Sequence, residues 1–263
     1  QLSFNRRFHM KDGSVRCNLC RHRCSIGLGG RGICRVRENR NGTLYNLSAG
    51  RIIAEQIDPI EKKPFFHFLP GTKAFSIACA GCNLRCRYCQ NWDISQRGPA
   101  KTDKFIAPEK LVDLALKSGS KSIAYTYSEP VVFYEYLIDC AKIAKEKGLK
   151  NVVITAGFIN EKPLKELIKY IDAFKIDLKG FNREFYAKYV SGGLEPVLET
   201  IKTIKKSNRH IEIVNLVIPG ANDTEEDMRK LSKWIKENVG PETPVHFTRF
   251  YPNYRMTQTP PTP

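Results

Sequence analysis

Apolar runs alternate with helix-like segments from residue 74 onward, and this alternation constrains the fold more than any other feature of the sequence. Runs that are apolar throughout are typical of parallel strands that helices cover. The six runs cover residues 74–80, 122–127, 151–156, 173–178, 211–218 and 245–250. The pattern predicts an α/β fold built of βα units, and periodicity alone leaves a barrel-like sheet and a doubly wound sheet open.

Helix start and stop signals lie between these runs. Pro108 occupies a first-turn position, Gly148 closes the second segment, and Asp223 followed by Glu226 resembles a capping box. The expected helices cover residues 108–118, 131–147, 162–170, 194–206 and 224–238. Each of the first five expected strands is therefore followed by one expected helix.

The first 70 residues lack this alternation and are rich in glycine, arginine and asparagine. They predict a small Cys-rich metal-binding module over residues 1–70. The charged, turn-prone segment 58–64 would connect it to a main domain over residues 71–263. The sequence stops directly after the sixth run, and whether the natural chain continues past Pro263 is left open.

Composition places the chain among ordinary globular proteins. Of its 263 residues, 41% are hydrophobic and 27% are charged, which excludes a disordered or fibrous chain. No run approaches the roughly 18 apolar residues that span a bilayer, and the first residues lack the apolar centre of a secretory signal. We therefore expect a cytoplasmic protein with no membrane contact. The net charge of +16 has three explanations that the sequence leaves open: solvated helix faces, binding of RNA, and binding of an acidic electron donor.

Nine cysteines without an export signal favour metal chemistry over disulfides. Cys82, Cys86 and Cys89 form a C-x3-C-x2-C motif at the carboxyl end of the first apolar run, the end where α/β enzymes place their chemistry. Three thiolates can hold three irons of a 4Fe-4S cluster and leave the fourth iron open. Cys79 could close the site as a fourth ligand, but its place inside the strand run favours a core position.

This motif, with Tyr88 before its last cysteine, resembles the signature of radical S-adenosylmethionine (SAM) enzymes. The resemblance implies a partial (β/α)6 TIM-like barrel of the radical SAM type. It also implies that the open iron binds SAM. One electron then cleaves SAM to a 5'-deoxyadenosyl radical that abstracts hydrogen from a substrate. The competing class is a non-enzymatic iron-sulfur electron carrier or Zn-binding adaptor with Cys79 as fourth ligand.

The resemblance further implies residues that contact SAM. Tyr127, Ser128 and Glu129 fall where the superfamily usually has a Gly-Gly-Glu segment that holds the methionine amino group, and the glutamate is kept. The alternative for Glu129 is a carboxylate that only starts the helix after Pro130.

Two later strands add candidates. Asp177 and Lys179 resemble the Asp-Leu-Lys segment of the pyruvate formate-lyase activating enzyme group, with a structural salt bridge as the alternative. Asn215 lies shortly before an Ile-Pro-Gly turn that this group places near the adenine, and Ile218 is the first residue of that turn. His246 on the last run fits either a satisfied barrel residue or a ligand to substrate.

The amino-terminal cysteines offer a complete set of four ligands. Cys17, Cys20, Cys24 and Cys34 suit a structural Zn ion or an auxiliary 4Fe-4S cluster, and the spacing allows both. This prefix, with the segments 58–64 and 67–71, is similar to the AmmeMemoRadiSam-system radical SAM enzymes. That similarity implies Memo-like and AMMECR1-like partners, and radical SAM chemistry implies a flavodoxin- or ferredoxin-type reductant. The substrate stays open between a protein that receives a glycyl radical, a small molecule and RNA.

Overall fold

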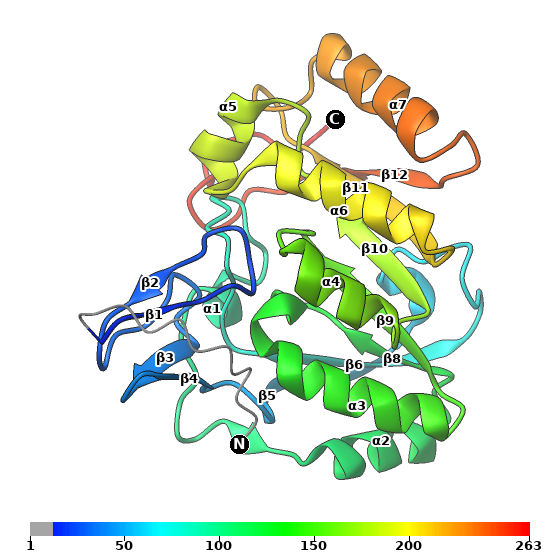
Figure 1. Cartoon of the computed structure of the whole chain (residues 1–263). Coiled ribbons are helices and arrows are strands. Elements are labelled where there is room, and N and C mark those ends of the chain that lie inside the picture. Colours follow the sequence, from blue (N-terminus) through cyan, green and yellow to red (C-terminus); the bar gives the residue numbers. More distant parts are fainter. Residues whose placement is uncertain (1–12) are drawn as a thin grey trace.

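The computed structural model describes residues 13–263, and the opening segment on which the absence of a secretory signal was argued lies almost wholly outside them. One eight-stranded sheet runs through the molecule in the order β12-β11-β10-β9-β8-β6-β5-β7 (Figure 1). Six of its strands are parallel to one another: β6 (Lys73–Cys79), β8 (Ser122–Tyr125), β9 (Lys150–Thr155), β10 (Ala173–Asp177), β11 (His210–Val217) and β12 (Val245–Arg249). These six confirm the strands predicted from the apolar runs.

The helices between these strands also match their predicted positions. They are α2 (Pro108–Lys117), η2 (Pro130–Phe133) leading into α3 (Tyr134–Glu146), α4 (Glu161–Ile168), α6 (Leu194–Lys206) and α7 (Glu225–Asn238). One detail was wrong. The side chain that caps α7 is Thr224, which accepts a hydrogen bond from the Asp227 N–H, and Asp223 instead accepts one from Gly220. Within residues 13–263, no helix is both long and apolar enough to cross a bilayer.

Shorter elements complete the chain. They are β1 (Val15–Arg16), β2 (Ser25–Ile26), β3 (Arg37–Arg40), β4 (Thr43–Asn46), η1 (Ile60–Lys62), α1 (Trp92–Ser95), β7 (Lys104–Phe105), α5 (Arg183–Phe185) and the π-helical turn η3 (Tyr186–Val190). The hairpins β1–β2 and β3–β4 lie beside the barrel (Figure 1). Cys17, Cys20 and Cys24 lie between β1 and β2, and Cys34 lies in the connection from β2 to β3.

Strand β5 (Arg51–Pro59) was not predicted as part of the main sheet. It pairs antiparallel with β6 along most of its length, and β7 pairs antiparallel with β5. The boundary at residue 70 stays a prediction, but a strand on its amino-terminal side belongs to the main sheet.

The two faces of the sheet have different partners because side chains alternate along each strand. Phe75 and Ile77 face the helices and join the large core. Small residues of the inner face, such as Ala74, Ala124 and Ala173, pack instead around Phe65 from the β5–β6 connection. Phe65 has no exposed surface and fills the amino-terminal end of the barrel, so that the opposite end is left for a cavity.

Candidate cofactor site at the carboxyl ends of the strands

A cavity of about 520 Å³ lies at the carboxyl ends of the parallel strands. Carboxyl strand ends are where barrel enzymes build their active sites. The structure brings eight of the sequence-predicted residues into the lining of this cavity: Cys82, Cys86, Cys89, Tyr127, Ser128, Glu129, Asp177 and Lys179.

The loop that carries the three cysteines follows β6 and is held by backbone hydrogen bonds. The N–H groups of Arg85 and Arg87 donate to η3 carbonyls, each at 2.9 Å. The Leu84 N–H lies 3.3 Å from the Cys82 sulfur. The Ser95 hydroxyl of α1 lies 3.2 Å from the Cys89 sulfur. Polar hydrogens aimed at sulfur stabilise thiolates that bind metal.

Burial works against free thiolates at this loop. It raises the pKa of Cys86 to about 11, although the nearby Lys179 ammonium acts in the opposite direction. Burial also raises the pKa of Cys82 well above its ordinary value. A bound metal deprotonates such thiols directly, so a buried set of three suits an iron-sulfur cluster better than it suits free reactive cysteines. The donor set therefore fits the cluster that the motif predicts.

Cys79 faces away from this cavity. It lies on the same face of β6 as Phe75 and Ile77, toward the helices, and has no exposed surface. Burial raises the pKa of its thiol, and the Cys140 thiol of α3 adds to that shift. The pleat of the strand thus separates Cys79 from Cys82, and the four-cysteine arrangement of the alternative function has no support in this geometry.

Glu129 is buried at the end of β8, with 3% of its surface exposed. Its carboxylate accepts hydrogen bonds from the Thr155 hydroxyl at 2.5 Å and from the Ala156 N–H at 2.9 Å, both at the end of β9. It also accepts one from the Val131 N–H at 3.2 Å, so it starts η2 as the alternative interpretation supposed. Burial raises the pKa of Glu129, and these hydrogen bonds oppose the shift.

Asp177 lies between two lysines of the same strand end. Lys175 contacts one carboxylate oxygen, and the Lys179 Nζ atom lies 3.3 Å from the other. Burial raises the pKa of Asp177, but the two ammonium groups outweigh it and the net shift is downward. Asp177 and Lys179 lie at the barrel mouth and form the salt bridge that was the alternative interpretation, and their contact with SAM stays a prediction. The cavity thus holds two fixed cations, Lys175 and Lys179, and one fixed anion, Asp177, close to Cys86.

Sequence reasoning missed a second polar group on this cavity. Tyr127, whose φ of +62° lies in the left-handed region, donates its hydroxyl to Asp58 at 2.7 Å. Lys63 donates to the same carboxylate at 2.6 Å, and its ammonium lies 4.3 Å from the centre of the Tyr127 ring. Asn91 donates to the Tyr127 carbonyl at 2.8 Å. Asp58 and Lys63 belong to the segment interpreted as a connection, and no motif singles them out.

Asn215 and Ile218 are not among the residues that line the cavity, so the geometry gives their predicted contact with SAM no support. The inward side chains of β11 are Val214 and Leu216, and strand alternation turns Asn215 toward the outer layer, where it donates to the Leu178 carbonyl at 2.7 Å. Ile218 has no exposed surface, and its N–H is bound by Asn222 at 2.7 Å. Both residues support the strand ends from behind.

The four amino-terminal cysteines line one small cavity with His22, Arg37 and Asn83. Burial raises the pKa of Cys17, and the Arg37 guanidinium acts against that shift. Asn83 follows Cys82 directly, and its carbonyl contacts the His22 ring at 2.7 Å. The two cysteine sets therefore lie on opposite sides of one short loop, and the predicted set of four is brought together.

Comparison with known proteins agrees with this geometry. The family model described as the radical SAM superfamily matches residues 76–235. The chain belongs to the radical SAM superfamily. It is therefore an enzyme whose cofactors are a 4Fe-4S cluster and SAM, which was the prediction from the cysteine motif.

Individual relatives agree. The chain is 46% identical over 255 residues to the uncharacterized protein MJ0808 of Methanocaldococcus jannaschii, with coverage of 97% of this chain and 76% of that protein. It is 27% identical to the pyruvate formate-lyase-activating enzyme of Clostridium pasteurianum over 59% of this chain and 66% of that enzyme. SuiB of Streptococcus suis, solved with bound SAM, matches at 16% identity with a TM-score of 0.52. That match covers 68% of this chain and 41% of SuiB, and it shows the fold.

Proposed function

We propose that Cys82, Cys86 and Cys89 bind the 4Fe-4S cluster and that the cavity beside them binds SAM and the substrate. When bound, the reduced cluster supplies the electron that cleaves SAM to a radical able to abstract hydrogen. The observation that carries this proposal is the placement of three cysteines, without Cys79, on one cavity with a buried carboxylate and a lysine–aspartate pair.

The chain's own residues would position SAM. The Glu129 oxygen that accepts from Ala156 has one lone pair left, which can receive a SAM amino group. Lys179 offers a positive charge to a carboxylate, and Asp177 an acceptor to ribose hydroxyls. The Ser128 hydroxyl is already used, because it donates to the Cys79 carbonyl at 2.6 Å and fixes the β8 turn.

For the substrate, we propose a polypeptide segment. The relatives named as activating enzymes support this class. The similarity of the prefix to the AmmeMemoRadiSam enzymes supplies candidate partners and no substrate. Memo-like and AMMECR1-like proteins are the first candidates, and a flavodoxin or ferredoxin is the proposed reductant. Small molecules and RNA remain outcomes of the test. Cys17, Cys20, Cys24 and Cys34 are proposed to bind one further metal centre, either Zn or an auxiliary cluster.

The decisive experiment compares two cysteine variants, one at the loop that lines the cavity and one on the helix-facing side of β6. After anaerobic reconstitution, wild type with SAM and dithionite should produce 5'-deoxyadenosine, and Cys86→Ala should not. The matched control Cys79→Ala should keep cluster iron and product formation near wild type. Loss of the cluster in Cys79→Ala with retention in Cys86→Ala would refute the assignment. Mixing with each candidate partner then shows which one increases turnover or gains a stable radical signal.

A further inference from the structure

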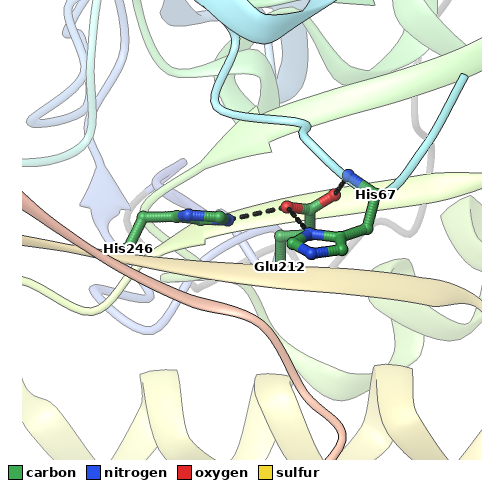
Figure 2. A group of neighbouring side chains, drawn as sticks. All are labelled: His67, Glu212 and His246. Carbon is green, nitrogen blue, oxygen red and sulfur yellow. Dashed lines mark hydrogen bonds and ion pairs between the residues drawn. The ribbon is translucent and has the colours of Figure 1, made fainter. Parts of the chain in front are cut away.

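A third group of metal-ligand side chains lies apart from the two cysteine sets. Glu212 of β11 has no exposed side-chain surface, and three histidines contact its carboxylate. Figure 2 shows two of them, His67 from the β5–β6 connection and His246 from β12, on either side of the carboxylate. The third, His210, lies two residues before Glu212 on the same strand.

The two oxygens of this carboxylate have different surroundings. Oε1 accepts from the His67 backbone N–H and from the His210 ring, each at 2.9 Å. Oε2 lies 3.2 Å from Nδ1 of His67 and 2.7 Å from Nε2 of His246, and it also receives the Phe66 N–H at 3.2 Å. Each oxygen thus accepts one backbone N–H, and Oε2 in addition lies within 3.2 Å of two imidazole nitrogens.

The spacing of these three atoms suits a metal ion. One ligand atom from each of His67, Glu212 and His246 lies within 4.8 Å of the other two. Zinc bonds to imidazole nitrogen and carboxylate oxygen are about 2.0–2.2 Å long, which puts neighbouring ligand atoms roughly 3–3.6 Å apart. The observed separations of 2.7 and 3.2 Å therefore need only a small outward movement.

The charge balance also favours a cation. Among the described residues, the ion pairs of Glu212 are all with histidines. Lys175, its register neighbour on β10, contacts Asp177 instead. A buried carboxylate requires a compensating positive charge, which neutral imidazoles do not provide. A bound metal ion would supply that charge.

We propose that His67, Glu212 and His246 bind one divalent first-row transition-metal ion, with Zn²⁺ as the probe. Two imidazoles and one carboxylate select such ions over Mg²⁺ and Ca²⁺, which prefer oxygen ligands. A histidine that binds a metal through one ring nitrogen carries its proton on the other. The His67 side chain is 58% exposed, so water can complete the coordination. His210 orients the carboxylate from the other oxygen.

The test uses the anaerobically reconstituted enzyme, with both cysteine sets loaded, then Zn²⁺ and desalting. Wild type should retain one more zinc per chain than His67→Asn or His246→Asn. The zinc K-edge spectrum of that extra ion should show only nitrogen and oxygen neighbours near 2.0–2.2 Å, whereas thiolate-bound zinc has sulfur near 2.3 Å. The exposed ring of His67 makes His67→Asn the variant least at risk of misfolding.

The matched control is His210→Asn, which removes an imidazole from the same carboxylate without removing a ligand. It should still bind the extra zinc, with affinity lowered about 10- to 100-fold as for other residues that orient ligands. Equal zinc content in wild type, His67→Asn and His246→Asn would overturn the proposal. So would a spectrum in which all zinc is bound by sulfur, or a His210→Asn variant that loses the ion as completely as His246→Asn.

Discussion

The buried ion pair between Arg37 and Glu135 makes a quantitative prediction about how the amino-terminal module is attached. Arg37 lies on β3 and Glu135 on α3, and their side chains are 4% and 6% exposed. The two guanidinium nitrogens contact the two carboxylate oxygens at 2.5 and 2.7 Å. Asn46 donates to the same carboxylate at 2.7 Å. This pair therefore joins the Cys-rich hairpins to a helix of the barrel.

Removing one partner leaves the other as an uncompensated buried charge. Arg37→Met should therefore lower the free energy of unfolding by about 3–5 kcal/mol, and Glu135→Gln should cost a similar amount. The double variant Arg37→Met/Glu135→Gln buries no unpaired charge, and the amide oxygen of the introduced glutamine would still accept from Asn46. Its cost should fall to about 1 kcal/mol, so the coupling energy between the two sites is several kcal/mol.

Urea unfolding of the four proteins without added metal, followed by circular dichroism, measures this double-mutant cycle. Arg37 also opposes the upward pKa shift of Cys17, so Arg37→Met should weaken metal retention at the amino-terminal cysteines as well. Single variants that each cost less than about 1 kcal/mol, with costs that simply add in the double variant, would refute the reasoning.

Three further predictions concern other parts of the structure. Gly81→Ala should destabilise the protein by more than about 1 kcal/mol in urea unfolding, because φ is +100° and an added Cβ would lie 2.6 Å from Val36; wild-type stability would contradict this. The pKa of Glu212 is lowered from 4.5 to about 2. Its ionised carboxylate therefore stabilises the folded state fully above pH 4.5, and this stabilisation is lost as the pH falls through 2. Between roughly pH 6 and pH 4, the free energy of unfolding should therefore fall by about 1 kcal/mol less in Glu212→Gln than in wild type. An equal fall in the two proteins, measured by urea unfolding at each pH, would argue against this. Lys179→Met should raise the dissociation constant for SAM at least about tenfold by equilibrium dialysis, and an unchanged constant would remove this lysine from the site.

Much of the fold could be predicted from local sequence signals. The apolar runs and the helix signals between them are read within short windows, and the six parallel strands and their helices follow them closely. The cysteine loop, Glu129 and Asp177 were found because each follows a strand in a recognisable motif. Parallel strands place their carboxyl ends at one edge, so these motifs meet.

Features that depend on pairing between distant segments could not be predicted. His67 and Glu212 are 145 positions apart, and nothing in either local sequence indicates the other. The same holds for β5, because nothing in its local sequence indicates that it joins the parallel sheet through an antiparallel pair. Asn215 was expected at the cavity for a different reason. A motif locates the end of a strand, but it does not tell which of the alternating side chains face the cavity.

The segment from Lys63 to His67 touches three separate environments within five residues. Lys63 lines the cofactor cavity, Phe65 fills the barrel floor, and His67 contacts Glu212 beside β12. Lys63 and Phe65 are buried, and the exposed His67 lies only two residues after Phe65. This short connection joins the cavity to the proposed ion site, and any coupling through it must be reciprocal. The factor by which an ion at His67 changes affinity in the cavity would equal the factor by which the cavity's ligand changes affinity for the ion.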